Sequence, residues 1–131
     1  MNKLITKLLL AVLFVLGTVG AEAQTTYYSK AAATDFNDVN SWGTATNGTG
    51  AAPASISNAD NFVVGNGSSM TLSATASVRA LYIGNFTGFS PATATGSLTI
   101  AAGNSITVSR ATGNNATLGI GASGTLTVTG G

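Results

Sequence analysis

The sequence predicts an all-β protein: a parallel, right-handed β-helix with three short strands in each coil of about 28 residues. Two observations carry this prediction. Several short segments alternate apolar with small or polar side chains, which is the period of a strand that buries one face. The pattern also recurs along the chain. Asn61–Val64 and Ser69–Leu72 return 36 positions later as Ser97–Ile100 and Ser105–Val108, and Ser97–Ile100 returns 28 positions later as Thr125–Val128. An antiparallel β-sandwich also alternates and is the alternative, but its strand spacings need not repeat.

Residues 1–23 have the features of a secretory signal peptide. Two lysines precede an apolar run from Leu8 to Leu16, and small residues lead up to Ala23. This order predicts cleavage after Ala23, which leaves Gln24 as the mature N-terminus. A membrane anchor is the alternative, but a span needs ~20 apolar residues. We therefore expect a secreted or outer-surface protein with no membrane span after cleavage.

Residues 24–58 are predicted to form an N-terminal cap followed by a linker. Four aromatic residues lie in the first part, and a stretch rich in Gly, Ala and Thr follows over residues 44–55. Asp, Asn and Ser residues between positions 34 and 41 favour a turn or one helical turn. A solenoid needs an atypical terminal unit that covers the end of its core. The aromatic residues suit that role: Tyr27, Tyr28, Phe36 and Trp42.

Residues 59–131 are predicted to form the coils, with three sets of strands stacked in parallel. The first set is Asn61–Val64, Ser97–Ile100 and Thr125–Val128, the second is Ser69–Leu72 and Ser105–Val108, and the third is Ala80–Ile83 and Thr117–Ile120. Stacking makes one continuous core of their inward residues: Phe62, Val64, Met70, Leu72, Leu81, Ile83, Leu98, Ile100, Ile106, Val108, Leu118, Ile120, Leu126 and Val128. We expect further coils beyond Gly131. An unpaired edge on the last strand predicts end-to-end self-association.

The composition excludes several classes of function. The chain has no Cys and no His, which excludes disulfides, the usual catalytic triads and the usual zinc sites. After cleavage three cations balance three carboxylates, and a net charge of zero argues against nucleic-acid binding. Asp35 and Asp38 lie in a predicted turn, where capping explains them better than acid–base catalysis or calcium binding. We therefore predict no catalytic residue, no metal site and no cofactor.

Outward-facing threonines form two predicted stacks, with Thr71 below Thr107 and Thr99 below Thr127. Flat threonine arrays on stacked strands are similar to the ice-contacting faces of ice-binding proteins, so ice binding is a remote alternative function. Threonine is also favoured at exposed strand positions because its β-branched side chain suits the pleat. That preference explains the same residues without a ligand.

The connection 84–96 carries the candidate ligand-binding residues. Phe86 and Phe89 lie in it, and Tyr82 faces outward on the strand that leads into it. Loops on a rigid scaffold are frequent binding sites, and aromatic faces suit sugar rings. Packing of the two phenylalanines onto the coil beneath them is the alternative.

Four longer segments of the chain carry a resemblance to a known class of proteins. These are YYSKAAATDFNDVNSWG at 27–43, NADNFVVGNGSSMTL at 58–72, and GSLTI and GTLTV at 96–100 and 124–128. With them the chain resembles the N-terminal part of secreted and cell-surface β-helical repeat proteins of Bacteroidetes-type bacteria. The resemblance implies export, in many members through the type IX secretion system, and an adhesin-like role.

These features together predict a non-catalytic structural or adhesive scaffold at the cell surface. Its expected partners are surface glycans or other surface proteins. Two alternatives stay open. One is a glycan- or surface-binding module that uses the 84–96 loop, and the other is the N-terminal piece of a β-helical carbohydrate-active enzyme.

Overall fold

The computed structural model describes residues 24–85, 95–109 and 117–129 of the chain. The predicted signal peptide, 1–23, lies outside the described residues. The prediction of an all-β protein is confirmed for these residues, whose regular structure consists of short strands and one 3-10 helix. In chain order these are β1 (Thr26–Ser29), η1 (Val39–Ser41), β2 (Trp42–Gly43), β3 (Asn61–Val64), β4 (Ser68–Leu72), β5 (Ala76–Val78), β6 (Ala80–Ile83), β7 (Gly96–Ile100), β8 (Ile106–Val108), β9 (Thr117–Ile120) and β10 (Gly124–Val128).

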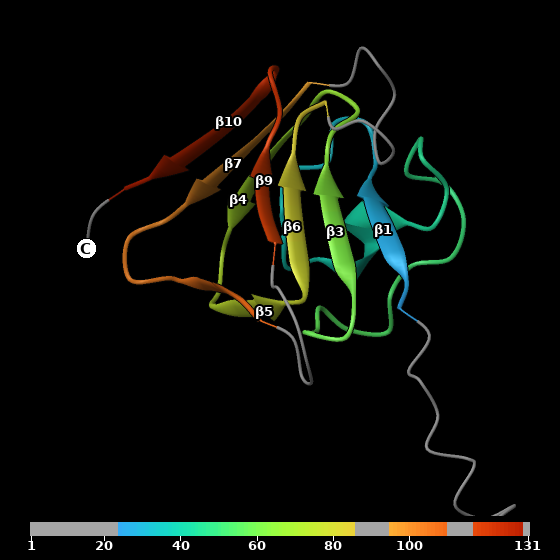
Figure 1. Cartoon of the computed structure of the whole chain (residues 1–131), viewed down its shortest axis with the longest axis horizontal. Helices are drawn as coiled ribbons and strands as arrows, with labels where there is room; N and C mark the ends of the chain where they lie inside the picture. Colours follow the sequence, from blue (N-terminus) through green and yellow to red (C-terminus); the bar gives the residue numbers. More distant parts are fainter. Residues whose placement is uncertain (1–23, 86–94, 110–116, 130–131) are drawn as a thin grey trace, which may run out of the picture.

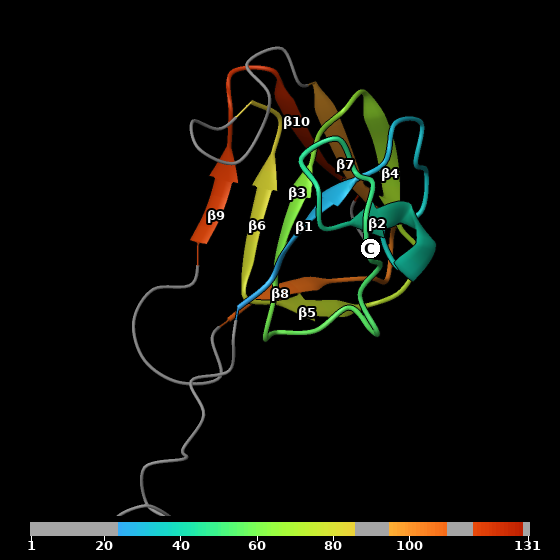
Figure 2. The same cartoon turned by 90° about the vertical axis from the view of Figure 1, so that its right-hand side faces the viewer.

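The strands form three sheets, which we name A, B and C. Sheet A has the order β2-β1-β3-β6-β9, sheet B the order β10-β7-β4, and sheet C consists of β5 and β8. From β3 onward the chain visits A, B and C in turn, repeats this path through β6, β7 and β8, and enters A and B again with β9 and β10 (Figures 1 and 2). Six of the strand pairs are parallel, and the pair of β1 with β2 is antiparallel. The alternative of an antiparallel sandwich is therefore wrong for the described strands.

Two of the predicted strand neighbours differ from the observed ones. The strand β3 pairs with β6 and not with β7, while β4 pairs with β7 and not with β8. The predicted pairs β7 with β10 and β6 with β9 are confirmed. The difference comes from β5. The sequence predicts only a connection there, because this strand is short and its inward residues, Ala76 and Val78, are small. Without this strand, every later strand is assigned to the wrong sheet.

The predicted offset of 28 residues between β7 and β10 is observed in sheet B. Ser97 of β7 lies beside Ser69 of β4 at an offset of 28 positions in the sequence, and β10 follows β7 at the same offset. In sheet A the offset is uneven. Leu81 of β6 pairs with Phe62 on one side and Leu118 on the other, so the step from β6 to β9 is much longer than the step from β3 to β6. The connections between β6 and β7 and between β8 and β9 account for the longer step.

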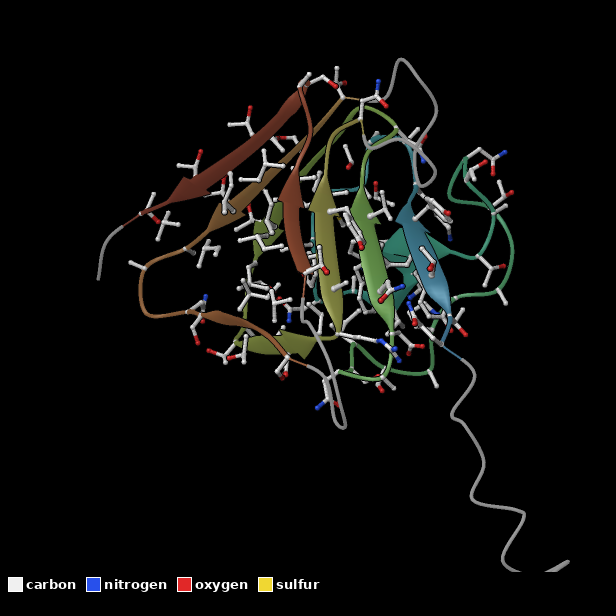
Figure 3. All side chains as sticks on the ribbon, in the orientation of Figure 1. Atoms are coloured by element: carbon white, nitrogen blue, oxygen red, sulfur yellow. The ribbon has the colours of Figure 1, made fainter. Side chains whose placement is uncertain are left out.

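A hydrophobic core fills the space between the sheets (Figure 3). It is formed by residues from all three sheets and from the N-terminal segment: Phe36, Trp42, Phe62, Val64, Met70, Leu72, Ala76, Val78, Leu81, Ile83, Leu98 and Ile100. Ile106, Val108 and Leu126 are partly buried against it. The predicted inward residues Leu118, Ile120 and Val128 are instead 52%, 48% and 65% exposed, because β9 and β10 are edge strands of their sheets.

Aromatic side chains close the core on the side of the N-terminal segment. Trp42 and Phe36 are fully buried, and the Trp42 ring packs edge-to-face with Phe36 and Phe62 at centroid distances of 5.0 and 4.9 Å. Trp42 Nε1 donates a hydrogen bond of 2.9 Å to the Phe36 carbonyl oxygen. Tyr27 stacks on Phe62 at 5.6 Å, which continues the cluster onto β1. Tyr28 is not part of this cluster, because alternation along β1 turns its side chain to the opposite face of sheet A.

Candidate functional site

The carboxylates of the described chain hold turns together. Asp35 Oδ1 accepts hydrogen bonds from the Asn37 backbone N–H and the Ser73 hydroxyl, at 2.9 and 2.8 Å. Asp38 caps η1 by accepting from the Asn40 backbone N–H at 2.9 Å. Asp60 accepts from the Thr25 backbone N–H and from the hydroxyl of a nearby serine. Each of the three carboxylates therefore stabilises a turn or a strand end.

Within 24–85, 95–109 and 117–129, no three His, Cys, Asp or Glu side chains come close enough to hold an ion together. In the same residues no helix has the length and apolarity that crossing a membrane requires.

The outer face of sheet B carries two aligned rows of hydroxyl side chains. In the first row Ser69 lies beside Ser97 and Ser97 beside Thr125. In the second row Thr71 lies beside Thr99 and Thr99 beside Thr127. We call these six residues the hydroxyl array. The predicted neighbours Thr99 and Thr127 are confirmed, but Thr71 does not lie under Thr107, because Thr107 belongs to β8 and pairs with Ser77 of β5.

The hydroxyl array is supported by the core beneath it. Between its two rows the side chains of Met70 and Leu98 point inward and are buried, and Leu126 is partly buried behind them. Ser97 Oγ donates a 2.9 Å hydrogen bond to Ser69 Oγ, which links two strands of the first row. The array residues are exposed or half-exposed on all three strands. Parallel pairing spaces them by about 4.8 Å across the strands and about 6.6 Å along them.

The candidate residues of the 84–96 loop are only partly described. Phe86 and Phe89 lie outside the described residues. Tyr82 lies on β6 and is half-buried, with its side chain on the outer face of sheet A. Its register partner on β3 is Val63, whose partner on β1 is Tyr28. The structure therefore brings together two tyrosines that are far apart in the sequence.

We call Tyr28, Val63 and Tyr82 the tyrosine row. Tyr28 is half-buried like Tyr82, while Val63 between them is buried although it faces away from the core. Beside the row, on the same face, Thr26 lies next to Asn61, and Asn61 next to Ala80. None of these residues is charged. Among them, Tyr28, Tyr82 and Thr26 are partly exposed, whereas Asn61, Val63 and Ala80 are buried.

Comparisons with protein families, with curated proteins and with solved structures give no match. The sequence identifies Tyr82 as a candidate but misses Tyr28, which it assigns to the cap. Strand alternation in TYYS, residues 26–29, could have identified Tyr28 as an outward-facing residue, because it places Tyr27 on the core side and Tyr28 on the outer side.

Proposed function

We propose that the protein is a non-catalytic scaffold of the secreted or cell-surface type, folded as a parallel β-solenoid. The observation that carries the proposal is the register of the sheets. Sheet A pairs Phe62 with Leu81 and Leu81 with Leu118, and sheet B pairs Met70 with Leu98. Like residues therefore lie on like residues, as expected when a chain lengthens by adding similar coils. A rod built this way holds attached segments at a distance from a surface.

The aromatic closure supports the same proposal. Solenoids require a terminal unit that seals the core, and Phe36 with Trp42 seals the core beside β1. The low charge and the predicted leader support export to the outside of the cell.

The experiment that tests the proposal follows the chain through export. We expect mass spectrometry of the surface or secreted fraction to find the mature protein starting at Gln24. A Leu13→Arg variant, which places a charge in the apolar run of the leader, should leave the uncleaved chain inside the cell. Full-length protein that stays inside the cell in both forms would contradict the proposal.

A second candidate function is contact with ice, favoured by the three-stranded hydroxyl array. The array repeats its hydroxyls at about 4.8 Å across the strands and about 6.6 Å along them. Hydroxyl groups at a regular repeat can hold a layer of ordered water molecules. Thr99 occupies the middle of the second row, between Thr71 and Thr127.

A bulky charge in the middle of the hydroxyl array should abolish ice contact. We expect wild-type protein to inhibit ice recrystallisation and a Thr99→Lys variant to lose the effect. Thr107→Lys is the matched control, because Thr107 is exposed on β8 outside the array. Equal growth of ice crystals with wild type and with no protein would reject this function.

A further inference from the structure

We propose that the turn at Asn47 and Gly48 is a self-modification site, where Asn47 loses ammonia and becomes aspartate or isoaspartate with water as the only other reactant. An asparagine followed by glycine is prone to this reaction, because glycine has no side chain to obstruct ring closure. The chain contains a second such pair, Asn66 and Gly67. The sequence alone gives the two pairs similar reactivity, so a difference between them comes from the fold. The proposal is independent of the export route and of the hydroxyl array.

The reaction begins when the Gly48 backbone nitrogen attacks the side-chain carbonyl carbon of Asn47. A bond forms between Gly48 N and Asn47 Cγ, the N–H proton passes through solvent to Nδ2, and the Cγ–Nδ2 bond breaks to release ammonia. The product is a cyclic imide. Water then opens the imide: cleavage between Gly48 N and Cγ gives aspartate, and cleavage between Gly48 N and the main-chain carbonyl carbon gives isoaspartate. No oxidant or reductant takes part.

Two hydrogen-bond donors of Thr49 activate Asn47. The Thr49 backbone N–H donates to Asn47 Oδ1 at 3.0 Å, and the Thr49 hydroxyl donates to the same oxygen at 2.7 Å. Negative charge develops on this oxygen when Gly48 N attacks Cγ, and donors already aimed at such an oxygen lower the barrier. Asn47 is exposed, and in the part of the chain that the structure describes its Nδ2 has no hydrogen-bond partner. The leaving nitrogen is therefore released without loss of a contact.

The side chain of Asn66 is held in the opposite way. Its Nδ2 donates to the Ser29 and Thr46 carbonyl oxygens at 2.7 and 2.9 Å, and the residue is half-buried. Loss of ammonia would break both bonds, and no described residue donates to Asn66 Oδ1. The attacking nitrogens do not distinguish the two pairs, because Gly48 N–H and Gly67 N–H each donate to a backbone carbonyl oxygen at 2.8 Å. The side-chain contacts alone therefore favour Asn47.

The modification changes the charge of the protein at an exposed loop. Either product adds one negative charge at position 47, so a chain cleaved after Ala23 goes from a net charge of zero to −1. Isoaspartate also lengthens the main chain by one carbon inside the turn that the Ala45 N–H closes on the Thr49 carbonyl oxygen at 2.8 Å. At Asn66 the same reaction would place a carboxylate against two carbonyl oxygens, so its protection preserves the contacts of this side chain with β1 and with the turn at Asn47.

Peptide mapping of aged protein tests the proposal. Folded wild-type protein is incubated at mildly alkaline pH, and mass spectrometry follows each asparagine after a digest that cuts at Phe62, between the two pairs. We expect Asn47 to convert about tenfold or more faster than Asn66, because loss of ammonia from Asn66 breaks two hydrogen bonds. In urea the fold no longer distinguishes the pairs, and their rates should agree within about threefold. The proposal is overturned by equal rates in the folded protein, by faster conversion at Asn66, or by conversion of Asn47 in urea alone.

Two valine variants test the contribution of the Thr49 hydroxyl. Thr49→Val removes one of the two donors to Asn47 Oδ1 and should slow conversion of Asn47 in the folded protein by about three- to tenfold, with no effect in urea. Thr46→Val is the matched control, because Thr46 is exposed in the same loop and its hydroxyl makes no hydrogen bond to another described residue. This control should convert like the wild type, and thermal melts verify that both variants are folded. Conversion of the Thr49→Val variant at the wild-type rate overturns activation by Thr49.

Discussion

Replacing Trp42 with alanine is expected to lower the free energy of unfolding by about 3–5 kcal/mol. Trp42 is fully buried, and its ring fills the space between Phe36 and Phe62. The substitution removes this packing and leaves the Phe36 carbonyl oxygen without the indole donor. Because domains of this size are typically stable by about 5–15 kcal/mol, a large part of the total is lost. Urea denaturation followed by far-UV circular dichroism measures the change.

The matched control for Trp42 is Tyr28→Thr. Both residues lie in the N-terminal aromatic segment, but Tyr28 is on the outer face of sheet A and outside the core cluster. Its replacement should cost less than about 1 kcal/mol. If the two substitutions cost the same, the aromatic closure does not have the role assigned to it. Trp42 is the single tryptophan of the chain, so its fluorescence in the wild type reports unfolding of this end directly.

Gly96→Ala is expected to destabilise the protein by about 3 kcal/mol through backbone crowding. Gly96 begins β7 at the turn from sheet A into sheet B. A Cβ atom there would lie 2.3 Å from the Val64 carbonyl oxygen and 2.7 Å from its carbonyl carbon. Both are backbone atoms, so no side-chain rotation relieves the clash. Thermal unfolding monitored by calorimetry should show a clear fall in midpoint.

A substitution at Gly103 distinguishes the cost of a Cβ clash from the cost of a left-handed backbone conformation. Gly103 has a φ of +79°, but nothing lies within 4 Å of a Cβ built on it. Asparagine tolerates this left-handed conformation better than other residues, so Gly103→Asn should cost below about 1 kcal/mol. The reverse order of the two effects would show that the strands approach each other differently at the sheet A to sheet B turn.

Strong local patterns make most of the strands predictable. The sequences GSLTI and GTLTV alternate large apolar residues with hydroxyl residues, NFVV is an apolar run after Asn61, and the strands β7, β10 and β3 lie where these patterns indicate. The strand β5 is not predicted because Ala76 and Ser77 give almost no apolar contrast. Sheet membership depends on counting strands along the path, so one short strand left out of the count changes the neighbours of β3 and β4.

The candidate faces are only partly predictable for the same reason. The residues of the second hydroxyl row can be recognised as outward threonines, but Thr71 joins that row only when β4 is paired with β7. The tyrosine row requires β1 to lie beside β3, a pairing between distant parts of the sequence that no local pattern encodes. Alternation shows which face a side chain occupies, whereas register determines which other side chains share its neighbourhood.

Disulfide trapping measures the register most directly, because the chain has no native cysteine. Directly paired residues on neighbouring parallel strands lie about 4.8 Å apart, inside the Cα range that a disulfide accepts. We expect a double variant with Thr71→Cys and Thr99→Cys to form the bond on oxidation, as read by intact mass and free-thiol labelling. A double variant with Thr71→Cys and Thr107→Cys should keep both thiols free. Bond formation in the second variant and not in the first would contradict the observed stacking of β4 on β7, and with it the hydroxyl array.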